Sequence, residues 1–251
     1  MSFLTQSEVI ASRSMNYLYI YLDIGFLLIL AGLLFWKKKY QALLVGLFGG
    51  ILYFAVDYGI FYAWLGTRKV EGADTAWFLL WLSMSYGFTN FVWIWLWLDH
   101  DSRLLEWSIL IPLAWFSEAL ISQYAGQNTG TITITRGTGQ YHWVMAIFLV
   151  VGYLYLIIHN LAASKEKRYP ILWILAIGIL VQFAWEAVLA VTGIRNQSWQ
   201  TLIINSLLET NMGLPYLYLI HEALGQKIGE DLKRTKGDPS AERSEISAKN
   251  H

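Results

Sequence analysis

The chain has 251 residues, of which 56% are apolar and only 14% are charged, and its mean hydropathy is +0.42. This composition lies outside the range of ordinary soluble domains and predicts a protein embedded in a lipid bilayer. The absence of cysteine excludes disulfides, thiol chemistry and cysteine-ligated metal sites, and a net charge of zero gives no indication of a nucleic-acid partner.

Hydrophobic runs along the chain predict the number of membrane spans. A helix needs about 20 apolar residues to cross the hydrocarbon core of a bilayer. The runs that reach this length are 17–36, 41–65, 76–98, 104–123, 142–160, 170–193 and 199–222. They predict an all-α, multi-pass protein with seven transmembrane helices in one domain, residues 1–224. The charged segment 225–251 is expected to be a disordered cytoplasmic tail.

The positions of lysine and arginine predict the orientation. Thirteen of them lie in the loops after the first, third and fifth helices and in the tail, and the opposite set of segments holds only Arg13, Arg68, Lys69, Arg136 and Arg195. Cytoplasmic loops carry the excess of positive charge. The amino terminus is therefore expected outside and the carboxyl terminus in the cytoplasm, in the plasma membrane if the chain is bacterial.

Five acidic side chains lie inside the predicted helices: Asp23, Asp57, Glu118, Glu186 and Glu209. Ionisable groups at bilayer depth are costly and by default mark a functional site. In the predicted topology all five lie between the midplane and the outer face, which indicates an acid-lined cavity. Crowding and loss of solvation disfavour the charged form, so some of these carboxyls should be protonated near neutral pH. Asp23 could instead face the outer headgroups or pair with Arg68 or Arg195.

The sequence also contains an internal similarity. Residues 54–57 (Phe-Ala-Val-Asp) match residues 183–186 (Phe-Ala-Trp-Glu), and each segment is followed by a Gly-x-Arg that ends at Arg68 or Arg195. Thr89-Asn90 similarly matches Thr210-Asn211. These matches predict two three-helix units, 17–98 and 142–222, joined by the helix at 104–123 in a parallel 3+1+3 repeat. Chance matches between aromatic-rich helices are the alternative.

Polar residues at helical spacing accompany the acids. Tyr53 precedes Asp57 by four residues, as Gln182 precedes Glu186 and Asn205 precedes Glu209. We expect Glu209, Asp57 and Glu186 to have a functional role. The expected ligand-binding residues are Tyr53, Tyr58, Tyr86, Asn90, Trp93, Gln182, Trp185, Asn205, Asn211 and Glu118. Hydrogen bonds between helices are the alternative role for the acids. Two-His and Glu-x-x-His spacings are lacking, so no metal or cofactor is expected.

Two further features bear on the expected cavity. The segment 128–140, with its alternation of Thr and Ile from 131 to 135, could form a small hairpin over the cavity mouth or an irregular loop. Pro215 should kink the last helix just below Glu209.

The segment 208–218, Leu-Glu-Thr-Asn-Met-Gly-Leu-Pro-Tyr-Leu-Tyr, resembles the last helix of the small integral-membrane terpene cyclases of fungal meroterpenoid and indole-diterpene pathways. Those enzymes have an acid four residues before a Gly-Leu-x-Tyr-x-Tyr segment, and the dipeptide Glu106-Trp107 is similar to a Glu-Trp there. The resemblance implies that Glu209 is one key acid. The family's second acid lies in a helix-2 Ala-Trp-Glu motif, which Asp57 matches by position and Glu186 by motif.

The resemblance implies a cyclase that acts on a lipophilic polyprenyl substrate. A neutral carboxylic acid would protonate an alkene or epoxide, and aromatic rings would stabilise the resulting carbocation. A 3+1+3 plan is equally typical of small-solute transporters of the SWEET and PnuC kinds, in which Asn90 and Asn211 would clamp the solute. A receptor or assembly factor without catalysis or transport is a third possibility.

Overall fold

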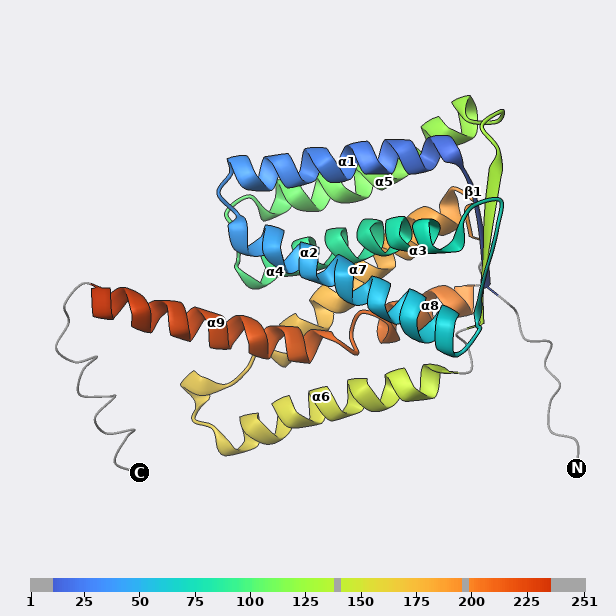
Figure 1. The fold of residues 1–251 in the computed structure, drawn as a ribbon. Coiled ribbons are helices and arrows are strands. Elements are labelled where there is room, and N and C mark those ends of the chain that lie inside the picture. The colour runs from blue at the N-terminus through green and yellow to red at the C-terminus, as the bar shows by residue number, and fades with distance from the viewer. Residues whose placement is uncertain (1–10, 138–140, 196–198, 236–251) are drawn as a thin grey trace, which may run out of the picture.

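A computed structural model describes residues 11–137, 141–195 and 199–235. The chain is mostly helical, and its helices run back and forth between two ends of a bundle (Figure 1). Helix α1 (Tyr17–Trp36) begins where the Asn16 side chain accepts a hydrogen bond from the Tyr19 N–H at 3.0 Å. Helix α2 (Tyr40–Phe54) continues without a break into the π-helix η1 (Ala55–Trp64).

The next passes follow the same pattern. Helix α3 (Thr75–Ser83), the π-helix η2 (Met84–Phe88) and α4 (Thr89–Leu98) form one continuous rod. It is followed by α5 (Leu104–Ala125), α6 (His142–Ala162), the short 3₁₀ turn η4 (Lys165–Lys167) and α7 (Ile171–Val191). The first six predicted spans therefore correspond to helical passes in the structure.

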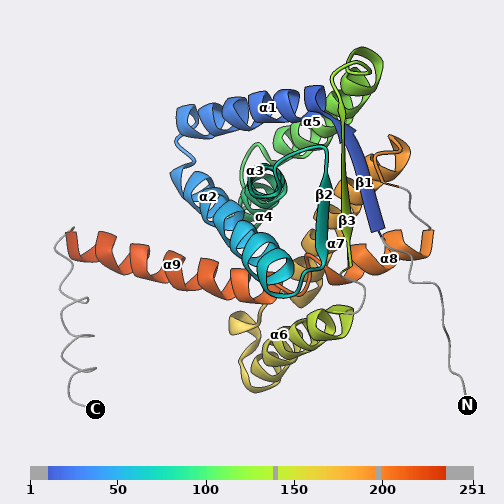
Figure 2. The ribbon, with the colours of Figure 1, turned by 45° about the vertical axis from the view of Figure 1, so that its right-hand side comes forward.

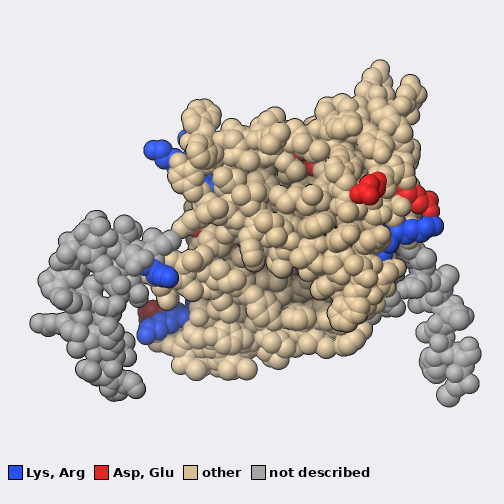
Figure 3. All heavy atoms as spheres, viewed as in Figure 1, with Lys and Arg blue, Asp and Glu red and all other residues tan. Residues whose placement is uncertain are grey.

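Among the described residues, five helical segments are long and apolar enough to cross a membrane: Tyr17–Trp36, Tyr40–Trp64, Leu104–Ala125, His142–Ala162 and Lys165–Val191. This agrees with an integral membrane protein. The rod from α3 to α4 is not among them, because its tryptophans, its serines and Asn90 lower its mean hydropathy. In Figure 3 charged side chains gather at the two edges of the molecule, with a broad uncharged surface between them.

The predicted last helix, 199–222, is wrong as a single element. The chain forms α8 (Trp199–Leu208), turns through residues 209–213, and then forms α9 (Leu214–Thr235). Pro215 lacks the N–H that a continuous helix would need, and it lies instead in the first turn of α9, where none is required. Because α9 reaches Thr235, the predicted tail begins as helix, and residues 236–251 lie outside the described part.

The expectation of an all-α fold is also wrong, because three strands form an antiparallel sheet: β1 (Ala11–Asn16), β2 (Arg68–Glu71) and β3 (Thr131–Arg136). Their order is β1-β3-β2, and the sheet crosses the helix ends at one end of the bundle (Figure 2). The predicted hairpin at 128–140 is thus a single strand between two distant partners. Ile132 and Ile134 are fully buried on one face, as a period of two requires.

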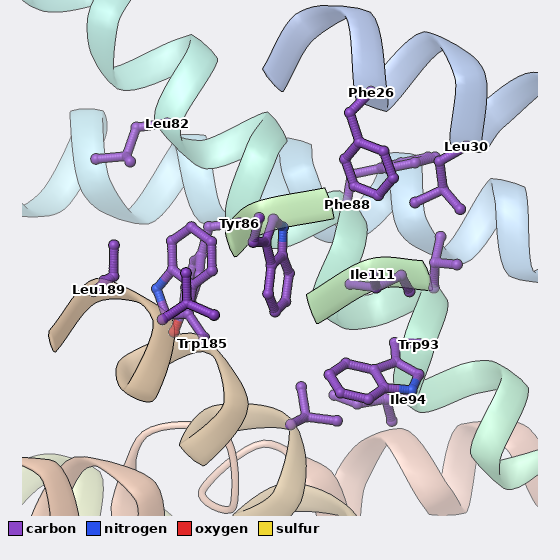
Figure 4. Packing of buried hydrophobic residues seen from close by; sticks show 14 of the residues in the cluster. Phe26, Leu30, Leu82, Tyr86, Phe88, Trp93, Ile94, Ile111, Trp185 and Leu189 are labelled. Carbon is purple, nitrogen blue, oxygen red and sulfur yellow. The ribbon is translucent and has the colours of Figure 1, made fainter. Parts of the chain in front are cut away.

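A core rich in aromatic side chains holds the helices together. Gly49 lets α2 approach α4, because a Cβ there would lie 2.4 Å from the ring of Phe91. Tyr86 from η2 packs against Trp185 from α7, with ring centroids 5.6 Å apart (Figure 4). The ring centroids of Trp115, from α5, and Trp185 are 4.7 Å apart. This core fixes the positions of η2 and α7 at the sheet end, where the charged side chains meet.

Candidate functional site

Asp57, in the π-helix η1, is ion-paired with two arginines. Its Oδ1 accepts from Arg68 Nη2 at 2.7 Å, and its Oδ2 lies 3.2 Å from Arg136 Nη2. Asp57 is 7% exposed and Arg68 is 4% exposed, so the pair is shielded from solvent. A buried carboxylate with two guanidinium partners is stabilised in its charged form. Asp57, one of the expected catalytic residues, is consequently a poor proton donor in this ion-paired state.

Glu186, on α7, is held in the same way. Arg195 Nη1 lies 2.6 Å and 2.7 Å from its two carboxylate oxygens. Gly66 and Gly193, two residues before Arg68 and Arg195, have positive φ values of 61° and 71°. Glycine tolerates this conformation, and the turn directs each arginine back toward the acid of the preceding helix. The Gly-x-Arg match in the sequence therefore corresponds to a matching ion pair in the structure.

The sheet brings the arginines together. Arg68 and Arg136 are partners in the register of β2 and β3, and Arg13 forms an isolated antiparallel bridge with Arg195. The Arg13 guanidinium also lies 6.0 Å from the centre of the Trp185 ring, in a cation–π contact. Four arginines from four distant segments thus lie at one end of the bundle.

Arg13, Arg68 and Arg136 remain charged near neutral pH. Burial, together with the charge of Arg136, lowers the pKa of both Arg13 and Arg68 to about 10, and Arg195 contributes at Arg13. For Arg136, burial also acts to lower the pKa, but the carboxyl groups of Asp57 and Glu209 outweigh it, so the pKa is raised. These three guanidinium groups are therefore cationic beside the carboxyl groups of the site.

Glu209 lies in the break between α8 and α9. Gln182 donates to Glu209 Oε2 at 2.9 Å and to Glu186 Oε1 at 3.2 Å. The Gln182 carbonyl in turn accepts from the hydroxyls of Thr210 at 2.6 Å and Tyr86 at 3.3 Å. Of the three expected catalytic acids, Glu209 is the one with no ion pair to an arginine among the described residues.

Two adjoining hollows meet at Glu209. The first, which we name the arginine cavity, has a volume of about 70 Å³ and is lined by Tyr53, Val56, Asp57, Phe61, Arg68, Tyr86, Arg136, Met145, Arg195, Glu209 and Met212. The second, which we name the apolar groove, has a volume of about 190 Å³ and is lined by Leu52, Tyr53, Val56, Phe91, Ile94, Glu209, Thr210, Met212, Gly213, Leu214 and Leu217. Four residues line both hollows, so the two lie side by side with Glu209 at their boundary.

Several expected site residues do converge here. Asp57, Glu209, Tyr53 and Tyr86 line the arginine cavity. Four further expected residues lie next to these: Glu186, Gln182, Asn205 and Trp185. Gln182 donates to Glu186, Asn205 donates to Glu186 at 3.4 Å, and Trp185 packs against Tyr86.

Other expected ligand-binding residues lie elsewhere. Tyr58 stacks on Phe54, with ring centroids 5.2 Å apart. Trp93 donates to Ser108 at 2.9 Å, and the Asn211 side chain bonds to the Tyr153 hydroxyl at 2.9 Å. Trp93 and Asn211 therefore act in contacts between separate segments, whereas the Tyr58 ring stacks within its own continuous helix.

Asn90 and Glu118 are also outside both hollows. Asn90 is 1% exposed, and its side-chain amide has no hydrogen-bond partner among the described residues. Neither Asn90 nor Asn211 lines the arginine cavity or the apolar groove. Glu118 is 6% exposed and interacts electrostatically with Asp23 across the contact between α5 and α1, which lie side by side (Figures 1 and 2).

Asp23 does not face headgroups or pair with Arg68 or Arg195, as its position in the sequence allowed. It is fully buried and accepts hydrogen bonds from Trp81 Nε1 at 2.8 Å and Ser85 Oγ at 2.9 Å. The carboxylate therefore belongs to the contact between α1, α3 and η2 and is separate from the arginine cavity.

The arginines are the functional residues that sequence reasoning missed. The sequence indicates Arg68 and Arg195 as loop charges, as ends of the repeat and as possible partners of Asp23, and Arg136 as a loop charge. The available signal was the buried acid nine or eleven residues before each Gly-x-Arg arginine, because a charge inside a membrane helix requires a partner of opposite sign.

Comparison with protein families, with curated proteins and with solved structures finds no match to this chain. Among the described residues, no three His, Asp or Glu side chains gather within reach of a single metal ion. What the site does must therefore be argued from its own geometry.

Proposed function

We propose that this protein is a membrane enzyme in which Glu209 acts as general acid on a lipophilic, polyprenyl-type substrate. The observation that carries the proposal is the position of Glu209 where the polar arginine cavity meets the apolar groove. A proton donor at such a boundary can reach a hydrocarbon chain while polar neighbours hold its carboxyl group. The resemblance of residues 208–218 to membrane terpene cyclases implies the same acid.

In this proposal Asp57 and Glu186 have a different role from Glu209. Their arginine partners keep them as carboxylates, so they are positioning residues that hold the guanidinium groups around the cavity. Gln182 orients Glu209 through the 2.9 Å hydrogen bond, and this bond fixes which oxygen faces the substrate. Glu209 is then the one group of the three that is able to carry the proton.

The proposed step is balanced in atoms and electrons. The Glu209 carboxylic acid transfers its proton to one carbon of an alkene, forming a C–H bond and leaving a cation on the adjacent carbon. The π electrons of a second alkene attack that cation and close a ring. Loss of a proton from a neighbouring carbon to a base or water restores an alkene, so the product is an isomer of the substrate and the acid can be regenerated.

Aromatic side chains support a cationic intermediate at this place. Tyr53 and Tyr86 line the arginine cavity, with their ring centroids 4.8 Å apart, and Trp185 packs behind Tyr86. Aromatic faces attract cations and offer no strong nucleophile in competition with the alkene.

The architecture that goes with this proposal has seven membrane crossings, with α8, the break and α9 together as the seventh. The sheet end lies outside, and the two three-helix units, 17–98 and 142–222, are related as a parallel repeat. The matching pairs Asp57–Arg68 and Glu186–Arg195 support the repeat.

Transport of a small solute is the second candidate, and the break in the last helix favours it. Unwound helices with polar side chains at the break form the substrate sites of many transporters. Glu209, Thr210 and Asn211 lie at such a break. The positions of Asn90 and Asn211 outside both hollows argue against the pathway expected between them.

Solvent deuterium would test the proposed proton transfer. Purified protein would be incubated in D₂O with farnesyl- and geranylgeranyl-type alkenes and terminal epoxides. We expect cyclised isomers, those from the alkenes carrying one deuterium on carbon, and we expect Glu209→Gln to lower the rate by roughly 10²- to 10⁴-fold. Glu222→Gln, which changes the same residue type on α9 away from both hollows, should leave the rate unchanged.

The same variants separate the two candidates. If Glu209→Gln leaves the cyclisation rate unchanged, or if no cyclised isomer forms with the native protein, the enzymatic proposal fails. If the native protein in liposomes then takes up a solute and Glu209→Gln abolishes the uptake, transport replaces it.

A further inference from the structure

We propose that the arginine cavity and the apolar groove together bind an amphiphile with an oxyanion headgroup, a carboxylate or a phosphate ester. Its headgroup would lie against Arg68, Arg136 and Arg195, and its hydrocarbon chain in the apolar groove. This inference rests on the proposed function and names the class of its substrate.

The charges at the sheet end favour an anion. Arg13, Arg68, Arg136 and Arg195 bring four positive charges, whereas Asp57, Glu186 and Glu209 bring at most three negative ones. The excess grows when Glu209 carries the proton that the proposed reaction needs. A site with surplus positive charge in a low dielectric attracts an anion strongly.

Unsatisfied donors point the same way. The Nη1 of Arg68 and the Nε atoms of Arg13 and Arg136 are buried and have no hydrogen-bond partner among the described residues. Arg68 is only 4% exposed, yet its side chain lines the arginine cavity. Buried N–H groups are normally satisfied, and guanidinium groups bind carboxylate and phosphate oxygens in paired hydrogen bonds. An oxyanion in the cavity would supply acceptors to Arg68 and Arg136, which line it.

The apolar lining of the groove indicates that the rest of the ligand is a hydrocarbon chain. It shares Tyr53, Val56, Glu209 and Met212 with the arginine cavity and continues between Leu52, Phe91, Ile94 and Leu217. A free phosphate would fill the cavity and leave this apolar surface uncovered, whereas an attached chain covers both. Glu209 then lies beside the carbons nearest the headgroup, where protonation would start.

Ligand-induced thermal stabilisation of the full chain in a neutral detergent tests the inference. The probes are dodecyl phosphate, dodecanoate, dodecyltrimethylammonium and inorganic phosphate. We expect the two anionic amphiphiles to raise the unfolding midpoint in a saturable way and the cationic one to leave it unchanged. Inorganic phosphate should act only at much higher concentration, because it lacks the chain. Stabilisation by inorganic phosphate as strong as by dodecyl phosphate would identify a free anion as the ligand and overturn the assignment of the groove.

Variants locate the binding. Arg136→Gln should weaken dodecyl phosphate binding roughly 10- to 100-fold, and Arg136→Lys less, because lysine keeps the charge without the paired hydrogen bonds. Arg103→Gln removes an exposed arginine near the start of α5 and should change nothing. Leu52→Trp narrows the groove. It should weaken the binding of dodecyl phosphate but not the binding of inorganic phosphate. Equal binding by the Arg136 and Arg103 variants, or by anionic and cationic amphiphiles, would overturn the inference.

Glu209→Gln separates this inference from the proposed function. It should bind dodecyl phosphate at least as tightly as the native chain, since it removes a carboxyl group from the cavity, while losing deuterium incorporation. If dodecyl phosphate fails to bind but Glu209-dependent incorporation into neutral polyprenyl substrates occurs, the headgroup inference alone is wrong. If it binds but no incorporation occurs with any substrate, the catalytic proposal alone fails.

Discussion

At the scale of single residues, the buried acids Asp57 and Glu186 are each stabilised by arginine partners. Asp57 lies in a π-helical turn of a span whose other residues are mostly apolar, and π-helical turns are frequent at functional sites. Burying the charge of Asp57 is unfavourable, and its ion pairs with two arginines, one from β2 and one from β3, offset this free energy. Arg68, Arg136 and Arg195, which the positive-inside count treats as free loop charges, are thus held in ion pairs inside the protein.

Removing this carboxylate should be costly. Asp57→Asn leaves Arg68 and Arg136 without their anion, and breaking a buried ion pair on one side costs about 3–5 kcal/mol. We expect a correspondingly lower free energy of unfolding for Asp57→Asn, measured by denaturant titration in detergent. The exposed pair of Lys69 and Glu71 provides the control, and Glu71→Gln should be indistinguishable from the native chain. Similar stabilities for the two variants would mean that the arginines do not depend on Asp57.

At the scale of elements, the break in the last helix is held in place by its neighbours. Gly178 on α7 faces the break, and a Cβ at this position would lie 2.2 Å from Asn211 Oδ1. Asn211 in turn bonds to Tyr153 on α6. The break is therefore packed between two helices, so that Glu209 has a defined position.

A methyl group at Gly178 should disturb this packing. Gly178→Ala forces Asn211 to move, and overpacking of this kind costs about 1–3 kcal/mol. Gly25→Ala is the matched control, because a Cβ there meets no atom within 4 Å and alanine favours helix by about 1 kcal/mol. Thermal unfolding of both variants should show a lower midpoint for Gly178→Ala and an equal or higher one for Gly25→Ala. A neutral Gly178→Ala would mean that the break is free to shift.

At the scale of the whole molecule, the passes of the chain separate two ends. Thr131 is exposed on β3 at the sheet end, and Ser102 is exposed in the turn between α4 and α5 at the other end. Arg68 and Arg136, both on strands of the sheet, line the arginine cavity. The side of the membrane that the sheet faces is therefore the side nearest this cavity.

Cysteine labelling tests this arrangement directly, because the native chain has no cysteine. In intact cells an impermeant thiol reagent should label Thr131→Cys, since the sheet end is proposed to lie outside, and should label Ser102→Cys only after the membrane is opened. Labelling of both from one side would contradict passage of α5, the helix between these two positions, across the bilayer. The reverse labelling pattern would mean that the sheet end faces the cytoplasm.

The sequence by itself determined the membrane setting and the first six helical passes, because apolar length and helical propensity are local properties of each segment. It also singled out Asp57, Glu186 and Glu209, since a carboxyl group in an apolar run is costly wherever the helix packs. Only the tertiary structure decided which of them are ion-paired. Strand β3 has no hydrogen-bond partner of its own until β1 and β2, from distant parts of the chain, lie beside it, and their pairing is what brings the arginines to the acids. Pro215 indicated a disturbance of the last helix, but the packing of the break against Gly178, from a distant part of the chain, appears only in the tertiary structure.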